Sequence, residues 1–179
     1  MTARTPEALA QAARERAQGL YNSRQMLCSE AVLVTINELF NGGLDEEQAV
    51  RLAAGMACGL GDSGCLCGAV NGGVAALGLI LGKEKPYARR KLCRKAANEL
   101  HDAFKEANKS TCCRVLSKKV KDTPKIHFAQ CAGLTGNAAA MVVGILLRHQ
   151  PDLSDTSTAP RKDNPIFARV KALANQFLR

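Results

Sequence analysis

The residues in this sequence most able to do chemistry are its eight cysteines. Thiolates bind soft metals and iron–sulfur clusters, and they also exchange with disulfides. Cys65 and Cys67 open the segment CLCGAVNGG, and Cys112 directly precedes Cys113. Both spacings are short for a comfortable disulfide between the two members. In a reducing compartment, such a set favours metal binding or redox cycling over structural cross-links.

Several of these cysteines lie at predicted helix starts, where backbone N–H groups are available to an anionic sulfur. Cys65 and Cys67 follow a glycine-rich turn at residues 59–64 and precede a predicted helix. Further helix starts are predicted at Cys28, Cys113 and Cys131. A buried core position is an equally good interpretation of Cys28 taken alone. For Cys58, Cys93 and Cys112 we expect structural roles, with Cys112 pointing away from its neighbour.

The spacing of the cysteines leaves the metal open. Structural zinc sites usually present a C-x-x-C pair, and this sequence has none. Four thiolates brought from separate helix starts suit an iron–sulfur cluster at least as well as zinc. His127 precedes Cys131 by about one helical turn; a solvated or capping histidine is the favoured interpretation, with a metal ligand as the alternative.

Four segments, taken together and in order, resemble the redox-active protein family C_GCAxxG_C_C. The segments are NSRQMLCSEAVL, CGAVNGG, TCCRVL and HFAQC. The resemblance covers roughly residues 17–148, and it implies that the family's four cysteines are Cys28, Cys67, Cys113 and Cys131. The same module is similar to part of split-Soret cytochrome c, a helical dimer that carries an iron–sulfur cluster beside its haems. The present sequence has no C-x-x-C-H, so we expect no c-type haem.

These observations favour an iron–sulfur protein that acts in electron transfer or redox sensing. We expect Cys28, Cys67, Cys113 and Cys131 to bind the cluster, with Cys65 as a fifth participant. One alternative is a thiol–disulfide oxidoreductase that uses the pair Cys65/Cys67 or the pair Cys112/Cys113. Another is a protein that holds zinc or a different soft metal without turnover.

Composition and periodicity predict the fold that positions these cysteines. Aromatic residues make up only 4% of the chain, which favours closely packed helices over a sheet. Caps and apolar periods predict helices over about residues 5–21, 29–40, 45–56, 67–81, 86–107, 111–120 and 124–148. A break near Gly133 is an alternative for the last of these helices. We expect an all-α, single-domain bundle over residues 1–179, with the glycine-rich helix 67–81 buried at its centre. Residues 150–162 are predicted to be a surface linker before a C-terminal helix that starts near Asn164.

The net charge of +9 comes entirely from residues 83–125, where 14 Lys and Arg face 5 Asp and Glu. A solvated helix face explains such a segment, and so does the docking of an acidic redox partner protein. Only Tyr87 and Phe104 are available there for base stacking, so we expect no nucleic-acid partner. Glycine-rich faces, and the dimer of the similar cytochrome, suggest a homodimer.

The sequence also predicts a soluble, cytoplasmic protein. Its N-terminal residues 1–21 contain no apolar run and no cleavage site, so we expect no signal peptide. The most apolar stretch, Ala132–Leu147, is interrupted by a threonine, a glycine and an asparagine. That stretch is also short for a bilayer span, so we expect no membrane association.

Overall fold

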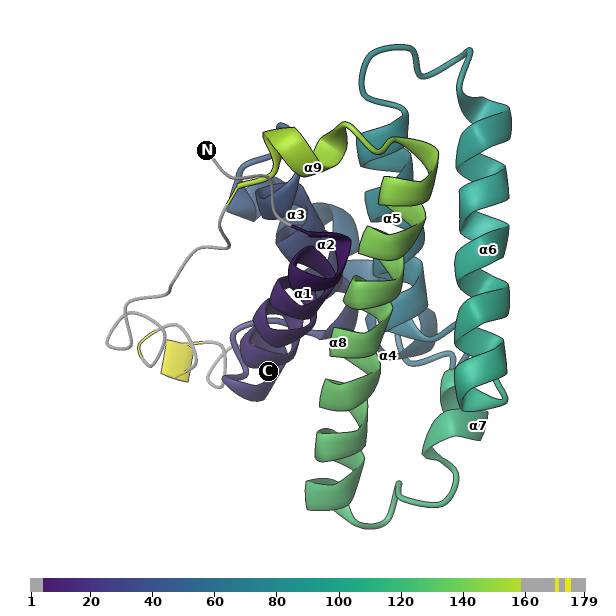
Figure 1. Ribbon diagram of the computed structural model, residues 1–179. Helices are drawn as coiled ribbons and strands as arrows, with labels where there is room; N and C mark the ends of the chain where they lie inside the picture. The colour runs from purple at the N-terminus through teal and green to yellow at the C-terminus, as the bar shows by residue number, and fades with distance from the viewer. Residues whose placement is uncertain (1–4, 159–169, 171–172, 175–179) are drawn as a thin grey trace.

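The computed structural model describes residues 5–158, 170, 173 and 174 (Figure 1). Its helices, in chain order, are α1 (Pro6–Asn22), α2 (Cys28–Leu39), α3 (Glu46–Ala53), the 3-10 turn η1 (Ala54–Met56), α4 (Ala57–Leu60), α5 (Gly68–Leu81), α6 (Arg90–Asn108), α7 (Cys113–Ser117), α8 (Pro124–His149) and α9 (Leu153–Thr156). No strand occurs in this part of the chain. The predicted all-α fold is confirmed.

The longest helix, α8, organises the bundle. It packs along α1 and contacts α2, α5 and α6, and Figure 1 shows it between α1 and α6. A Cβ added at Gly136 would lie 2.9 Å from the carbonyl oxygen of Arg14, so this glycine allows α1 and α8 to approach closely. The possible break near Gly133 does not occur, because α8 is continuous from Pro124 to His149.

Within the described part of the chain, α8 is the one helix that is long and apolar enough to cross a membrane. However, 61% of the most apolar stretch of α8 is buried against the rest of the fold. Its apolar side chains, such as Val142 and Leu146, belong to the core that it shares with α1, α2 and α5. Packing of α8 in the core of the bundle therefore explains its apolar composition.

The glycine-rich helix α5 is buried at the centre of the bundle, as the sequence predicts. It packs against α2, with α6 and α8 on its other sides. A Cβ at Gly72 would press into the backbone of Ser29 in α2, only 2.8 Å from its Cα atom. A Cβ at Gly73 would meet the side chains of Leu100 and Val142 at 2.7 and 3.0 Å. The glycines of α5 therefore set how closely its neighbours approach.

Several boundaries differ from those predicted: α3 ends at Ala53 rather than near residue 56, and α7 covers only Cys113–Ser117 of the predicted 111–120. The helix α2 begins at Cys28 rather than Ser29, because the side chain of Glu30 accepts a hydrogen bond from the N–H of Leu27 and so caps the helix start. The basic helix α6 begins at Arg90, four residues later than expected. The predicted linker contains the short helix α9, and its described end, Thr158, donates its N–H to the Leu39 carbonyl. Residues 159–162 and most of the C-terminal helix predicted from Asn164 lie outside the described residues.

Candidate functional site

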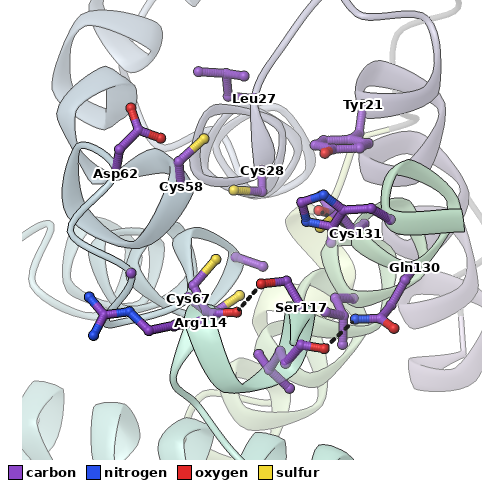
Figure 2. A pocket seen from close by; sticks show the side chains of 17 residues that line it. Tyr21, Leu27, Cys28, Cys58, Asp62, Cys67, Arg114, Ser117, Gln130 and Cys131 are labelled. Carbon is purple, nitrogen blue, oxygen red and sulfur yellow. Dashed lines mark hydrogen bonds between the residues drawn. The ribbon is translucent and has the colours of Figure 1, made fainter. Parts of the chain in front are cut away.

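Five cysteines from separate segments line one cavity of about 330 Å³. We call Cys28, Cys58, Cys67, Cys113 and Cys131 the cavity cysteines. Figure 2 shows the sulfur atoms of Cys28, Cys58 and Cys67 turned toward the same space. The volume is far larger than the roughly 30 Å³ that one water molecule occupies in the liquid. The cavity can therefore hold a group of several atoms.

Cys58 reaches this cavity because the chain reverses sharply after α3. Residues 58–62 all have positive φ, with Cys58 at 52° and Gly59 at 75°. A Cβ at Gly59 would lie 2.7 Å from the backbone of residues 64 and 65, so the turn closes tightly only around glycine. The sequence predicts the turn itself. Cys58, for which the sequence predicts a structural role, lines the cavity.

Cys28 occupies the first turn of α2, and its sulfur lies against the backbone of Gly68. A Cβ at Gly68 would overlap that sulfur, so the glycine of the CGAVNGG segment makes room for a cysteine on another helix. Burial raises the pKa of the Cys28 thiol, and backbone N–H bonds from Cys58 and Ser29 oppose that rise. The site therefore begins at the contact between α2 and α5.

Cys67 forms the N-cap of α5 and is only 5% exposed. The backbone N–H groups of Ala69 and Val70 point at its sulfur and favour the thiolate. Burial outweighs these bonds and, with the nearby sulfur of Cys28, raises the pKa of Cys67 to about 12. The predicted helix-start environment of this thiol is present.

Cys113 and Cys131 complete the cavity from α7 and α8. Cys113 is the first residue of α7, as predicted, whereas Cys131 lies in the second turn of α8 rather than at its start. Burial raises the pKa of both thiols, that of Cys131 to about 11. The hydroxyl of Tyr21 in α1 bonds to the sulfur of Cys131 and favours its thiolate. Sequence patterns around Tyr21 give no sign of this contact.

The cavity cysteines make one another harder to ionise. After burial, the main causes of the high pKa values of Cys67 and Cys131 are the neighbouring sulfurs, foremost that of Cys28. A bound metal cation would reverse this balance, because coordination removes the thiol proton outright. The donor set of the cavity therefore fits a positively charged metal group.

Polar residues other than cysteine also line the cavity. Asp62 and His127 contribute to its wall, and so does the exposed Arg114, whose guanidinium donates to the Ser63 carbonyl at 2.7 Å. Among the described residues, no three His, Cys, Asp or Glu side chains lie close enough together to hold a single metal ion. The thiols surround a space rather than a point.

Cys65 and Cys112 do not line this cavity; they lie together outside it, and we call them the outer pair. Their side chains hydrogen-bond each other, and the thiol of Cys112 also donates to the Gly64 carbonyl at 3.1 Å. Backbone N–H groups of Val115 and Arg114 lower the pKa of Cys112. The hydrogen bond between the two thiols raises the pKa of Cys65. Cys112 points away from Cys113, as expected. The structure thus pairs Cys65 with Cys112, not with Cys67.

A known protein family matches most of the chain. The family model described as "Putative redox-active protein (C_GCAxxG_C_C)" matches residues 26–145. The chain belongs to this family. The matched region begins just before Cys28 and extends beyond Cys131, so it contains all five cavity cysteines and the outer pair. No curated protein and no solved structure matches the chain. Its membership in C_GCAxxG_C_C identifies it as a cysteine-rich protein of a redox-active family.

Proposed function

We propose that this C_GCAxxG_C_C protein binds an iron–sulfur cluster in the cavity and uses it for electron transfer or redox sensing. The observation that carries the proposal is the convergence of five thiols, from five segments, on one cavity of about 330 Å³. Cys28, Cys67, Cys113 and Cys131 are the proposed ligands. We propose Cys58 rather than Cys65 as the fifth participant, because Cys58 lines the cavity and Cys65 does not.

A cluster suits this donor set better than a single zinc ion. Zinc takes four ligands at about 2.0–2.3 Å around one point, which draws their donor atoms close together. The described residues contain no group of three such side chains at that closeness. A cluster of several iron and sulfide atoms binds thiolates that stand farther apart. When bound, it would supply an electron acceptor and donor, while the N–H groups beside Cys28 and Cys67 would stabilise the charge on their sulfurs.

The decisive experiment is anaerobic purification followed by iron and sulfide analysis and an absorption spectrum. We expect a brown protein with iron and acid-labile sulfide in comparable amounts. Serine replacements of Cys28, Cys67, Cys113 and Cys131 should each remove most of the iron, whereas Cys93→Ser should not, because Cys93 lies on α6 and does not line the cavity. A colourless protein that cannot be reconstituted with iron and sulfide would overturn the proposal, and stoichiometric zinc would favour the alternative soft-metal role.

We also propose that an acidic redox partner docks beside the cavity. Within the basic segment 83–125, Arg114, Lys118 and Lys119 are exposed on or directly after α7, which forms one wall of the cavity. Such charges accelerate encounter with a negatively charged protein, and salt screens them. The rate of electron transfer to an acidic ferredoxin-type acceptor should fall steeply between low and physiological ionic strength. A rate that does not depend on salt would contradict this docking mode.

A homodimer is a further proposal. The glycine faces that suggest one from sequence are used within the chain, since Gly68, Gly72 and Gly73 contact its own helices. Exposed apolar side chains near the cavity give separate support: Leu60 is 48% and Val115 57% exposed. Gel filtration with light scattering at micromolar concentration should give twice the chain mass. A monomer under those conditions would rule the dimer out.

A further inference from the structure

The outer pair lies where two distant segments are joined by a short ladder of hydrogen bonds. The N–H of Cys67 donates to the Thr111 carbonyl, and the N–H of Arg114 donates to the Gly64 carbonyl, both at 2.8 Å. The guanidinium of Arg114 adds a bond to the Ser63 carbonyl. These contacts hold residues 63–67 against residues 111–114, although 47 positions separate Cys65 from Cys112.

The two thiols therefore contact each other on a backbone that is already fixed. Their side chains hydrogen-bond, and the thiol of Cys112 is oriented by its bond to the Gly64 carbonyl. The N–H of Cys112 is in turn bonded to the hydroxyl of Ser110. Because both chain segments are held from each side of the pair, a bond between the sulfurs requires no large rearrangement of the fold.

Access distinguishes this pair from the cavity cysteines. Cys65 is exposed and Cys112 is half-buried, and neither lines the cavity. A small molecule in solution can thus reach Cys65 without entering the cavity. Thiol–disulfide exchange needs this kind of access, because the attacking sulfur must approach along the axis of the disulfide that it breaks.

We propose that Cys65 and Cys112 form a reversible disulfide by exchange with low-molecular-weight disulfides. One of the two thiols loses its proton to solvent, and its sulfur attacks one sulfur of the small disulfide. The small S–S bond breaks, one small thiolate leaves, and a mixed disulfide remains on the protein. The second cysteine loses its proton and attacks the protein sulfur of that mixed disulfide, which releases the second small thiolate.

The products balance as one protein disulfide and two small thiols. The two electrons given up by Cys65 and Cys112 reduce the small disulfide, and the two protons lost from the protein thiols protonate the two small thiolates. An excess of the small thiol reverses each step. This site needs no metal, so it is independent of the cluster proposed for the cavity.

Disulfide mapping tests the proposal directly. The full-length protein would be equilibrated in buffers of stated ratios of reduced to oxidised glutathione, alkylated, digested and analysed by mass spectrometry. A peptide pair linked through Cys65 and Cys112 should increase with the oxidised fraction and disappear in excess reduced glutathione. In Cys65→Ser and Cys112→Ser, the remaining partner should instead retain one glutathione. Cys93→Ser should behave as the wild type.

Two outcomes would overturn the proposal. One is that Cys65 and Cys112 stay unlinked across the whole range of glutathione ratios. The other is that oxidation links Cys65 to Cys67, or Cys112 to Cys113, in place of the outer pair. Repeating the mapping in Cys28→Ser/Cys131→Ser separates this proposal from the iron–sulfur function. The Cys65–Cys112 link should form there unchanged even though cluster loading is lost.

Discussion

The cavity cysteines and the outer pair come from the same two stretches of chain, yet their surroundings are opposite. Cys67 and Cys113 line a cavity and have thiols whose pKa values burial raises. Cys65 lies two residues before Cys67, and Cys112 lies directly before Cys113. These two thiols hydrogen-bond each other outside the cavity. The difference follows from side-chain direction alone, because one ladder of hydrogen bonds holds both stretches. One piece of backbone can therefore present thiols suited to a buried metal group on one side and thiols suited to exchange on the other.

The largest expected effect separates Cys67 from Cys65. Cys67→Ser should abolish cluster loading, because it removes the buried sulfur of the N-cap residue of α5, which adjoins Cys28. Cys65→Ser should leave the iron content per chain unchanged. Iron and sulfide analysis of the two proteins, purified side by side under anaerobic conditions, measures the contrast. Equal loss of iron in both variants would make Cys65 a ligand and remove the distinction between the two sets of thiols.

Much of this arrangement is predictable from the sequence. Helix caps and apolar periods identify every long helix of the described chain to within a few residues, because those signals are local. The family resemblance selects the four cysteines that the structure brings to one cavity. The glycine turn 59–64 is evident from composition, since glycine adopts without strain the positive φ found at Gly59, Gly61 and Gly64.

The directions in which cysteines point are not predictable in this way. The sequence predicts that Cys58 ends a helix. In the structure, a left-handed φ of 52° turns the chain at Cys58 and brings this residue to the cavity. The sequence predicts that Cys65 lies at a helix start. Only the contact between its segment and residues 111–114 shows that Cys65 lies beside Cys112. Tyr21 reaches Cys131 from a helix 110 residues earlier. Each of these depends on tertiary packing that no local pattern contains.

The second contrast concerns pH in the metal-free protein. Burial raises the pKa of Cys67 to about 12, above its ordinary value near 9, so the folded state retains a proton that the unfolded chain releases. The contribution of the protonated Cys67 thiol to the free energy of unfolding is thus full below pH 9 and is lost as the pH rises toward 12. The free energy of unfolding, measured by urea titration between pH 8 and 10.5, should fall more steeply in the wild type than in Cys67→Ser. Parallel curves would show that this thiol ionises freely when folded.

The third contrast lies between two glycines of α5. Gly72→Ala should destabilise the protein by about 1–3 kcal/mol, because its Cβ would press into the backbone of Ser29 where α2 and α5 cross. Gly78→Ala meets no atom within 4 Å and should stabilise the helix by up to about 1 kcal/mol. Chemical denaturation of both variants measures the sign of the change in the free energy of unfolding. A neutral Gly72→Ala would mean that the α2–α5 contact, and with it the position of Cys28, is looser than described.

The smallest expected effect tests whether surroundings tune the cavity cysteines. Tyr21→Phe removes the hydroxyl that bonds to the sulfur of Cys131 but keeps the ring that stacks on Phe128, with centroids 4.9 Å apart. Such a bond is worth about 1 kcal/mol, so its loss can decrease a one-electron potential by at most about 40 mV. The direction follows because a donor to a ligand sulfur favours the more negative, reduced cluster. Protein-film voltammetry measures this decrease at unchanged iron content. Tyr87→Phe is the matched control, since Tyr87 is 79% exposed and does not line the cavity. An equal decrease in both variants would show that the potential does not depend on the bond to Cys131.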